Sequence, residues 1–575
     1  MNDTSPKPNW LAVGLSLALI VGWLLYSSYR WPTPQPPAKP AARAEAAAQK
    51  PAASAPAIAP SLKSAPKNTA PETRTALANG NLRAIFTSRG GGVARIDLLQ
   101  HAAQKNADPV VLNGGADDIT PVFSLTGWDA APAAYAQSSD AQSVTYTRTL
   151  PGGLRLERRY TLAPGDGYQI ELEQKITNPG AQAVTLPEYG MEIGAALPLY
   201  DGDLPQTVSA NWAQDEGKRY GRVNPGEFNP SNGFLSFGAH PARDAVSSPE
   251  KETDLRWAAV KNRFFALVVV PPADRPISSV VGRPVTVFPP GVDAGVFRPA
   301  TGIQAEARFA PLTLAAGETR TEHYVLYAGP KEHGRLAALG HGAGELMEFG
   351  FWSWVAIPLM SILEALHHVI PNYGWVIVFL TLALKIIFWP LQSAANHSMK
   401  QMQALAPKQK ELSEKYKSDP QRMQMEVMKL YKEYGVNPVG GCLPVLIQIP
   451  IFFGFYTMLQ SAVQFRHQSW LWVHDLVKPD TIALLPGLHL PVNPLPIIMA
   501  VSQWVVMKMT PQATENPQMK IMQFMPLVML VLFYNFAAAL ALYWTVNNLV
   551  TAVQTYHNLR KPIPLLHRIK KKKKS

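Results

Sequence analysis

The sequence predicts a polytopic α-helical membrane protein that also carries a large antiparallel β-sandwich domain. Long uncharged runs lie near both ends of the 575-residue chain, and only 16% of its residues are charged. Between these runs, polar and apolar residues alternate with a period of two. These observations argue against an ordinary soluble enzyme and against a disordered chain. The length predicts two or more domains.

The first apolar run, Trp10–Tyr29, contains no charged residue. As a helix it would span about 30 Å, the thickness of a bilayer core. A cleaved signal peptide is the alternative, but the run is long for one and carries aromatic residues suited to an interface. We therefore expect a transmembrane anchor at 1–30. Residues 31–75 contain 14 alanines and 10 prolines, which predicts an extended linker over 31–76.

The region 77–332 is predicted to form the β-sandwich. Apolar and polar residues alternate along 154–162 and 168–176, and Phe264–Val270 is an apolar strand closed by two prolines. Turn sequences rich in glycine and proline separate these segments. The sequence of this region contains no constellation typical of a metal site or a catalytic nucleophile.

The chain becomes apolar again from residue 345. Phe349–Ile370 is long enough to cross a membrane, but it contains Glu364, His367 and His368. We therefore expect an amphipathic helix in the membrane interface, within 333–371. The two histidines would point about 100° apart on a helix, which disfavours a shared metal. Further spans are expected at 375–390, 440–462, 491–509 and 521–558, the last being two spans with a turn near Asn535–Ala539.

Two basic clusters determine the predicted topology. The segment 393–438 and the tail from residue 559 each carry eight lysines or arginines. The positive-inside rule places both in the cytoplasm. The result is six spans, with both termini inside and the β domain outside. The last five spans form a core at 372–560, and a basic tail follows at 561–575.

The cytoplasmic segment 393–435 is predicted to be a helical hairpin. Ser418-Asp419-Pro420 is typical of a helix start, and Gly435 of a helix end. Narrow methionine-containing apolar stripes run along both arms. These stripes form either the seam between the two helices or a docking surface for partner helices.

Lys385 is the most informative candidate for function. It lies ten residues after Trp375 and five before Pro390, well inside the second span. A lysine at the centre of a span costs about 2.5–3.5 kcal/mol on insertion scales. It either extends to the nearby cytoplasmic interface or faces a water-filled cavity within the bundle. Thr381, one turn earlier, would share its face.

Other polar or amphipathic side chains also interrupt the predicted spans. They are Gln448, Gln503, Tyr543, Trp544, Asn547 and Asn548. Hydrogen bonds between helices would explain them individually. Their number together with Lys385 favours a hydrophilic groove, although spacing alone does not show that the faces converge. The confident spans contain no acidic partner for Lys385, and the sequence indicates no cofactor or metal. The lone cysteine, Cys442, is expected to have a packing role.

The segment Asn437–Phe452, NPVGGCLPVLIQIPIF, resembles the hallmark of the YidC/Oxa/Alb membrane protein insertases. The resemblance covers about 335–560. The β domain, beginning near Thr87–Gly91, is similar more weakly to the periplasmic domain of Gram-negative members. Supporting stretches are Asn372–Trp375, Lys385–Pro390, Trp472–Leu476, Lys520–Pro526 and Asn548–Val550.

The resemblance implies an inner-membrane insertase and chaperone, and not an enzyme. Five spans would surround a hydrophilic groove open to the cytoplasm and the lipid. Its expected partners are nascent membrane proteins, the Sec translocon, membrane lipids and the ribosome. The family's central cation is usually arginine, where this chain has Lys385, and Ala537–Ala539 replaces a frequent Pro/Gly turn. The candidate ribosome or lipid contacts are Arg568, Lys570, Lys571, Lys572, Lys573 and Lys574.

Two other function classes remain possible from the sequence. A small-solute transporter or channel would call for repeat symmetry or paired intramembrane charges, and neither is evident. A periplasmic binding module on a passive anchor would not require five further spans with polar residues.

Overall fold

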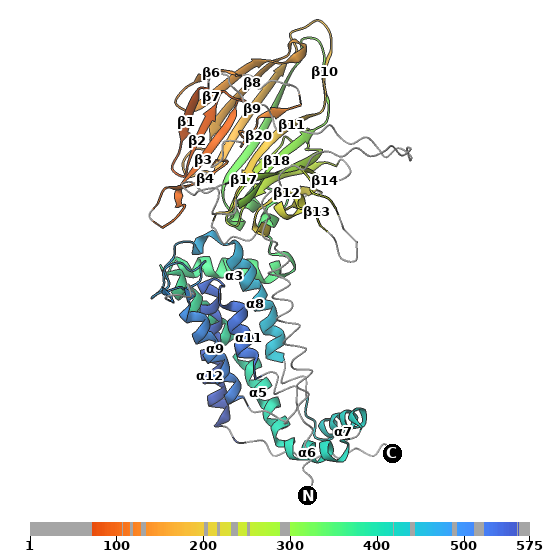
Figure 1. Ribbon diagram of the computed structural model, residues 1–575, viewed down its shortest axis with the longest axis vertical. Helices are drawn as coiled ribbons and strands as arrows, with labels where there is room; N and C mark the ends of the chain where they lie inside the picture. Colours follow the sequence, from red (N-terminus) through yellow and green to blue (C-terminus); the bar gives the residue numbers. More distant parts are fainter. Residues whose placement is uncertain are drawn as a thin grey trace, which may run out of the picture.

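The computed structural model shows a β-rich domain joined to a helical region (Figure 1). The predicted anchor, most of the linker, Cys442, Arg568 and Lys570–Lys574 lie outside the described residues. The described residues are 72–105, 107–114, 119–127, 134–199, 205–214, 219–231, 240–249, 253–287, 300–417, 419–437, 443–485, 491–510, 523–560 and 562.

The largest sheet of the β domain has nine antiparallel strands. The alternation predicted for 154–162 and 168–176 is confirmed, because Leu156, Tyr160, Ile170 and Leu172 are buried along two paired strands. In spatial order the strands are β13 (Arg219–Val223), β12 (Ser209–Gln214), β15 (Leu255–Lys261), β16 (Phe265–Val270), β20 (Thr319–Pro330), β9 (Gln169–Thr177), β8 (Arg155–Leu162), β7 (Ser143–Thr149) and β6 (Ala136–Ser139).

A second antiparallel sheet packs on the first, as a sandwich requires. Its strands β11 and β18 contact β15 and β12 across the interface, and Trp257 is fully buried. The strands of this sheet are β14 (Val246–Ser248), β17 (Ser279–Val287), β18 (Ala300–Phe309), β11 (Tyr189–Ala196) and β5 (Leu125–Thr126). Smaller sheets are formed by β1 (Arg74–Ala78), β2 (Leu82–Thr87), β3 (Gly92–Ala102) and β4 (Pro109–Leu112), and by β10 (Val184–Leu186) and β19 (Leu312–Leu314).

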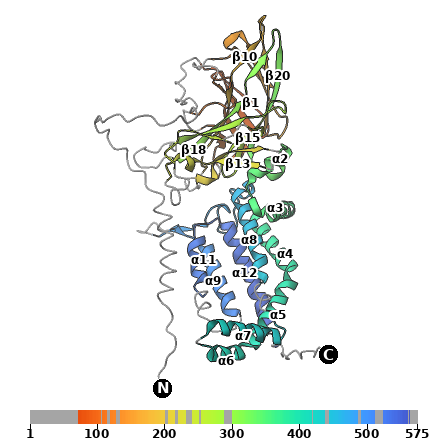
Figure 2. The same cartoon turned by 90° about the vertical axis from the view of Figure 1, so that its right-hand side faces the viewer.

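A short helical segment leads from the β domain to the bundle. It contains α2 (His333–Ala338) and two 3₁₀ turns, Ala343–Met347 and Gly350–Trp352. It ends in α3 (Ser353–His367), which runs across the end of the bundle nearest the β domain (Figures 1 and 2). A helix is therefore present where one was predicted, and its position in a membrane interface stays a prediction.

The β domain is fastened to the helical region by polar contacts. Arg263 Nε donates to Gln460 O at 3.2 Å, and Arg466 Nη2 donates to Ala102 O at 3.0 Å. Lys261 Nζ lies 2.8 Å from the Glu348 carboxylate. Lys261 is buried on the β domain, while Glu348 precedes α3, so this ion pair also joins the two parts.

The bundle has two groups of helices. Long ones lie side by side, and a short pair lies at the end far from the β domain (Figure 2). The helices are α4 (Tyr373–Ile387), α5 (Trp389–Ala404), α6 (Ala406–Lys415), α7 (Pro420–Glu433), α8 (Leu443–Ser461), α9 (Pro494–Met509), α11 (Met525–Phe533) and α12 (Ala538–Leu559). A two-stranded hairpin, β21 (Ala483–Leu484) and β22 (Pro491–Val492), precedes α9. The turn between α11 and α12 falls at 534–537, close to its prediction.

Helix length alone does not identify the spans. Among the described residues, no single helix is both long and apolar enough to cross a membrane, whereas α4 and α5 meet that test together with a bend of 59°. Pro390 lies in the first turn of α5, where its missing N–H has no cost, and α4 ends at Ile387, so the predicted span 375–390 covers α4 and the start of α5. The extent of this span stays a prediction. The predicted hairpin start at 393 falls inside α5.

The helical hairpin is made by α6 and α7. Asp419 caps α7 by accepting from Arg422 N at 3.0 Å, and Pro420 is its first residue, as predicted. Leu405 and Leu430 are buried at a small shared core, with Met402, Leu412 and Tyr434 packed against it. This packing confirms the seam interpretation for these residues of the stripes.

Candidate functional site

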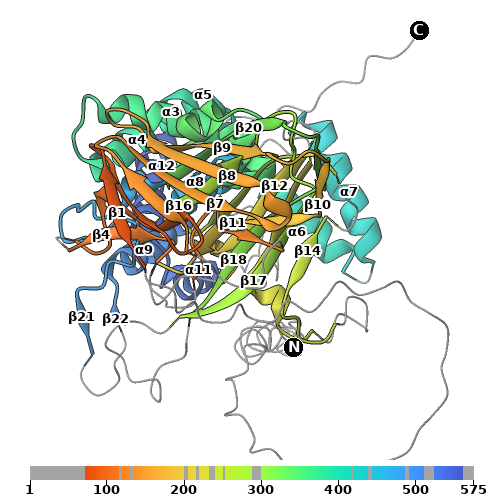
Figure 3. The same ribbon diagram turned by 90° about the horizontal axis from the view of Figure 1, so that it is seen from above.

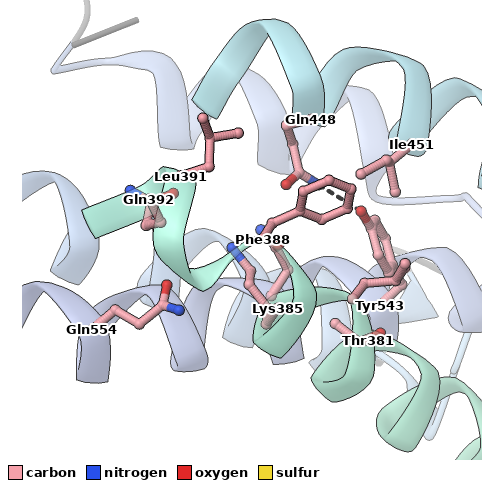
Figure 4. A pocket seen from close by; sticks show the side chains of 11 residues that line it. Thr381, Lys385, Phe388, Leu391, Gln392, Gln448, Ile451, Tyr543 and Gln554 are labelled. Atoms are coloured by element: carbon pink, nitrogen blue, oxygen red, sulfur yellow. Dashed lines mark hydrogen bonds between the residues drawn. The ribbon is translucent and has the colours of Figure 1, made fainter. Parts of the chain in front are cut away.

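A cavity lies between α4, α5, α8 and α12, with a volume of about 470 Å³ when the space open to the outside is counted. Figure 4 shows side chains from these helices converging on it. Its lining residues are Thr381, Leu384, Lys385, Phe388, Leu391, Gln392, Gln448, Ile451, Tyr543, Asn547 and Gln554. Lys385 is the single charged residue among them.

Lys385 lies in the last turn of α4, where the helix dipole favours a positive charge. Its Nζ donates to Thr551 Oγ1 on α12 at 2.9 Å. The side chain is half-buried, and in the described part of the chain it has no carboxylate partner. The Lys385 side chain is therefore held inside the cavity by a neutral hydroxyl, and no described carboxylate lies beside it.

The bend between α4 and α5 gives the cavity one of its walls. Phe388 is the C-cap of helix α4, and the axes of α4 and α5 are bent by 59° relative to each other at this point. Because of this bend, Leu391 and Gln392 of α5 reach the same space as Lys385.

Tyr543 connects α12 to α8 across the cavity. Its ring stacks on Phe455 with centroids 4.6 Å apart, and the residue is almost fully buried. Gln448 Nε2 donates to Tyr543 Oη at 2.5 Å, the bond drawn dashed in Figure 4. This pair fixes the spacing of two walls while exposing polar atoms to the interior.

Gln554 is the least satisfied polar group of the site. The residue is 2% exposed, and neither its amide oxygen nor its amide nitrogen has a hydrogen-bond partner among the described residues. A buried amide without a partner is costly, so natural proteins usually satisfy it with a protein group or an ordered water. Gln554 therefore indicates a wet cavity.

The polar residues of α12 lie on two different stripes. Tyr543, Asn547 and Gln554 recur at i, i+4 and i+11, and they face the cavity. Trp544 and Asn548 follow one position later, which turns them about 100° away, toward α9.

The contacts with α9 show what this second stripe does. Trp544 Nε1 donates to Gln503 Oε1 at 3.1 Å, and Asn548 Nδ2 donates to Ser502 Oγ at 3.0 Å. Gln503, Trp544 and Asn548 are therefore absent from the cavity lining, and they make hydrogen bonds between helices. The structure brings Lys385, Thr381, Gln448, Tyr543 and Asn547 together, and it places Gln503 and Trp544 elsewhere.

Thr381 lines the cavity without offering its hydroxyl proton to it. The residue is 1% exposed, and its Oγ1 donates to Ile377 O of its own helix at 2.7 Å. Three polar residues at the site were absent from the sequence-based set, namely Gln392, Thr551 and Gln554. The i, i+4, i+11 recurrence from Tyr543 was a usable signal for Gln554.

No metal site accompanies the cavity. Across the described residues, no group of three or more His, Cys, Asp or Glu is placed to hold an ion. His367 stacks on Tyr373 with centroids 3.8 Å apart, which fits the aromatic packing expected at an interface.

Two family models together match nearly all of the described chain. Residues 74–362 match the "YidC periplasmic domain", and residues 365–563 match the "60Kd inner membrane protein". The two descriptions are those of an inner-membrane protein with a periplasmic domain, and the periplasmic model covers the β-rich part of the chain.

Curated relatives specify the family further. A membrane protein insertase YidC from Syntrophus aciditrophicus is 30% identical over 83% of this chain and 82% of its own length. A membrane protein insertase YidC from Cupriavidus taiwanensis is 31% identical over 84% of this chain and 81% of its own length. A crystal structure of an active YidC insertase with its first transmembrane domain resolved covers 84% of this chain and 92% of that chain, at 17% identity and a TM-score of 0.34. The chain belongs to the YidC family of membrane protein insertases, whose role is non-enzymatic.

Proposed function

We propose that this protein inserts nascent membrane proteins through the Lys385 cavity and assists their folding. The observation that carries the proposal is a lysine that has no carboxylate partner among the described residues and faces a polar stripe of α12 inside the bundle. A polar segment that crosses the bilayer must otherwise leave water for hydrocarbon, at several kcal/mol for each unsatisfied group. A wet cationic cavity reaching partway across shortens that path.

The positive charge of Lys385 determines which substrate segments the cavity binds best. An acidic segment of the substrate is attracted to Lys385, and its hydrogen-bonding groups can exchange water for Gln448, Asn547 and Gln554. The apolar segment that follows then moves sideways into lipid, driven by its own transfer free energy. No nucleotide is required at this step.

Lysine at this position has a physical consequence. Arginine keeps its proton when desolvated, whereas a buried lysine can lose it. Water around Gln392 and Gln554 would keep Lys385 protonated, and this requirement explains why the Gln554 amide, which has no hydrogen-bond partner among the described residues, lies in the same cavity.

The remaining parts of the proposal concern topology and partners. Six spans place both termini in the cytoplasm, with the α6–α7 hairpin and the basic tail on the side where ribosomes deliver chains. Arg568 and Lys570–Lys574 would contact ribosomal RNA phosphates or anionic lipids. The Sec translocon is the expected partner for larger substrates. A small-solute transporter is disfavoured because the cavity lining contains a single charge.

Depletion of the protein tests the proposal. A small two-span substrate with an acidic periplasmic loop should lose protease accessibility from the periplasm, and a plasmid copy should restore it. A plasmid copy that carries Gln503→Leu, an uncharged substitution outside the cavity, serves as the matched control and should restore accessibility as well. Full insertion of the substrate after depletion would contradict the proposal.

A further inference from the structure

The β21–β22 hairpin projects from the bundle and presents apolar side chains. Figure 3 shows it extending outward from the helices. Ile482, Leu484 and Leu485 are all exposed, Leu484 at 58%. Leu484 lies in β21, and Ile482 and Leu485 flank the strand, so large apolar side chains are exposed along this whole segment. Such a cluster calls for an apolar surrounding.

The base of this hairpin is tied to the outer end of the bundle. Asn493 is fully buried, and its Nδ2 donates to Tyr534 O at 2.7 Å. Tyr534 Oη in turn donates to Pro491 O at 2.6 Å. Tyr534 lies in the turn between α11 and α12, at the end facing the periplasmic domain. The hairpin is therefore held at the depth where the bundle meets the periplasm.

Aromatic residues continue from the hairpin around the same end of the bundle. Trp472 Nε1 donates to Asp480 Oδ2 at 3.1 Å, and the same carboxylate oxygen accepts from Leu495 N of α9 at 2.7 Å. The ring centroids of Trp472 and Trp470 lie 6.1 Å apart, and those of Trp470 and Trp375, at the start of α4, lie 5.6 Å apart. Tryptophans at this position in an inner-membrane protein are typical of the headgroup region.

Leu471 adds a second exposed tip beside Trp472. Its φ of 48° is a left-handed conformation that suits glycine or asparagine better than leucine. The side chain is nevertheless large, apolar and 66% exposed. A lipid environment accounts for the exposure of this leucine side chain.

We propose that the β21–β22 hairpin and the Leu471 tip form a lipid-binding surface that anchors the periplasmic end of the bundle in the outer leaflet of the inner membrane. Its partner is the boundary between phospholipid headgroups and acyl chains, where amphipathic elements bury their apolar side chains. Exposed apolar side chains also occur on the crosswise helix α3, at Trp354, and on the residues that flank it, at Phe351 and Val369. This helix lies at the same end of the bundle. The bundle is thereby held at one depth by two separate elements.

Site-directed fluorescence in lipid nanodiscs tests this surface. The full-length chain carries one cysteine, so Cys442→Ser gives a background in which Leu484→Cys can be labelled with an environment-sensitive dye. Lipids with bromines near the headgroup should quench this label more strongly than lipids with bromines at the chain end. A label at Ser139→Cys, exposed on β6, should not be quenched, and a label at Leu549→Cys, exposed in the middle of α12, should prefer the deeper bromines.

Each other outcome overturns the proposal. An unquenched label with the red emission of Ser139→Cys would place the hairpin in water. An unquenched label with blue emission would show that protein covers it. A label at Ile482→Cys, with the same expected result, guards against a local disturbance at residue 484, and monodisperse elution confirms folding of each variant.

Discussion

The β domain and the helical cavity differ in how they hold buried charge. In the β domain, Glu322 is 1% exposed and meets Arg320 at 3.2 Å, while buried Lys261 meets Glu348 at 2.8 Å. In the cavity, Lys385 meets a threonine hydroxyl and, in the described part of the chain, no carboxylate. Paired charges give the first region stability and leave it little to offer a ligand. The uncompensated cation leaves the second region free to attract a passing acidic segment.

The largest effect should follow from reversing the cavity charge. Lys385→Glu should reduce insertion of a substrate with an acidic loop by at least about tenfold, equivalent to ~1.4 kcal/mol. Repulsion inside a low-dielectric cavity is the physical reason. The matched control is Lys508→Glu, an exposed lysine at the end of α9, which should change insertion far less. Similar losses from both variants would show that net charge matters and the cavity does not.

Breaking a charge pair in the β domain should affect stability instead. Glu348→Ala leaves Lys261 buried without its partner, which should cost about 3 kcal/mol of folding free energy. Thermal unfolding of the full chain in detergent would measure this loss, and exposed Glu345→Ala is the control. Insertion at a permissive temperature should persist. A variant that is stable yet inactive would contradict the division of roles between the two regions.

The same pair has a pH dependence of defined sign. Burial alone would raise the pKa of Glu348, but Lys261, Lys331 and Arg222 together lower it below its ordinary value of 4.5. A carboxylate with a lowered pKa stabilises the folded state above pH 4.5, and this contribution is lost as the pH falls through the lowered pKa. The difference in melting temperature between the wild type and Glu348→Ala should therefore become smaller below about pH 4.5. A constant difference down to pH 3 would remove the ion pair as its cause.

The basic tail should have a smaller, salt-dependent effect. Deletion of 561–575 should weaken co-sedimentation with ribosomes at low salt, because phosphate contacts release counterions. The difference should vanish at high salt, and arginine in place of Lys570–Lys574 should preserve binding. Unchanged co-sedimentation at low salt would leave the tail with a role in topology alone.

Removing the β domain should have the smallest effect on insertion. A deletion of about 80–320 that keeps the first span and α3 removes the partners of Gln460 and Arg466, which should lower thermal stability. It removes no residue of the cavity lining. Cleavage of the two-span substrate's loop by a periplasmic protease should remain measurable. Complete loss of insertion by a stably expressed deletion would show that the β domain takes part in the mechanism.

The sequence predicted local structure better than it predicted which distant residues contact one another. Periodicity identified the strands at 154–162 and 168–176, and turn chemistry identified the start of α7 at Pro420. Proline at 390 was ambiguous, since it can end one helix or begin the next, and here it begins α5. The contact of Arg466 with Ala102 joins residues 364 positions apart, and no local pattern encodes it.

The same limit applies to the site. Lys385, Tyr543 and Asn547 were identified because polar residues are costly within spans. Gln503 and Trp544 met the same criterion, yet they form a hydrogen bond with each other on the face of α12 that meets α9. Spacing along one helix separates two faces, but only the packed bundle shows which face meets the cavity.

The most direct measurement compares Lys385→Ala with Lys385→Arg on two substrates that differ only in the charge of the translocated segment. If Lys385 is the cation of the cavity, arginine should support insertion of both substrates. Alanine should fail on the acidic substrate while retaining much of the activity on the neutral one. Accessibility of the translocated segment to a periplasmic protease, in cells depleted of the wild-type protein, gives the readout. Equal activity of the alanine variant and the wild type on the acidic substrate would contradict the account, because Lys385 would then merely extend to the interface.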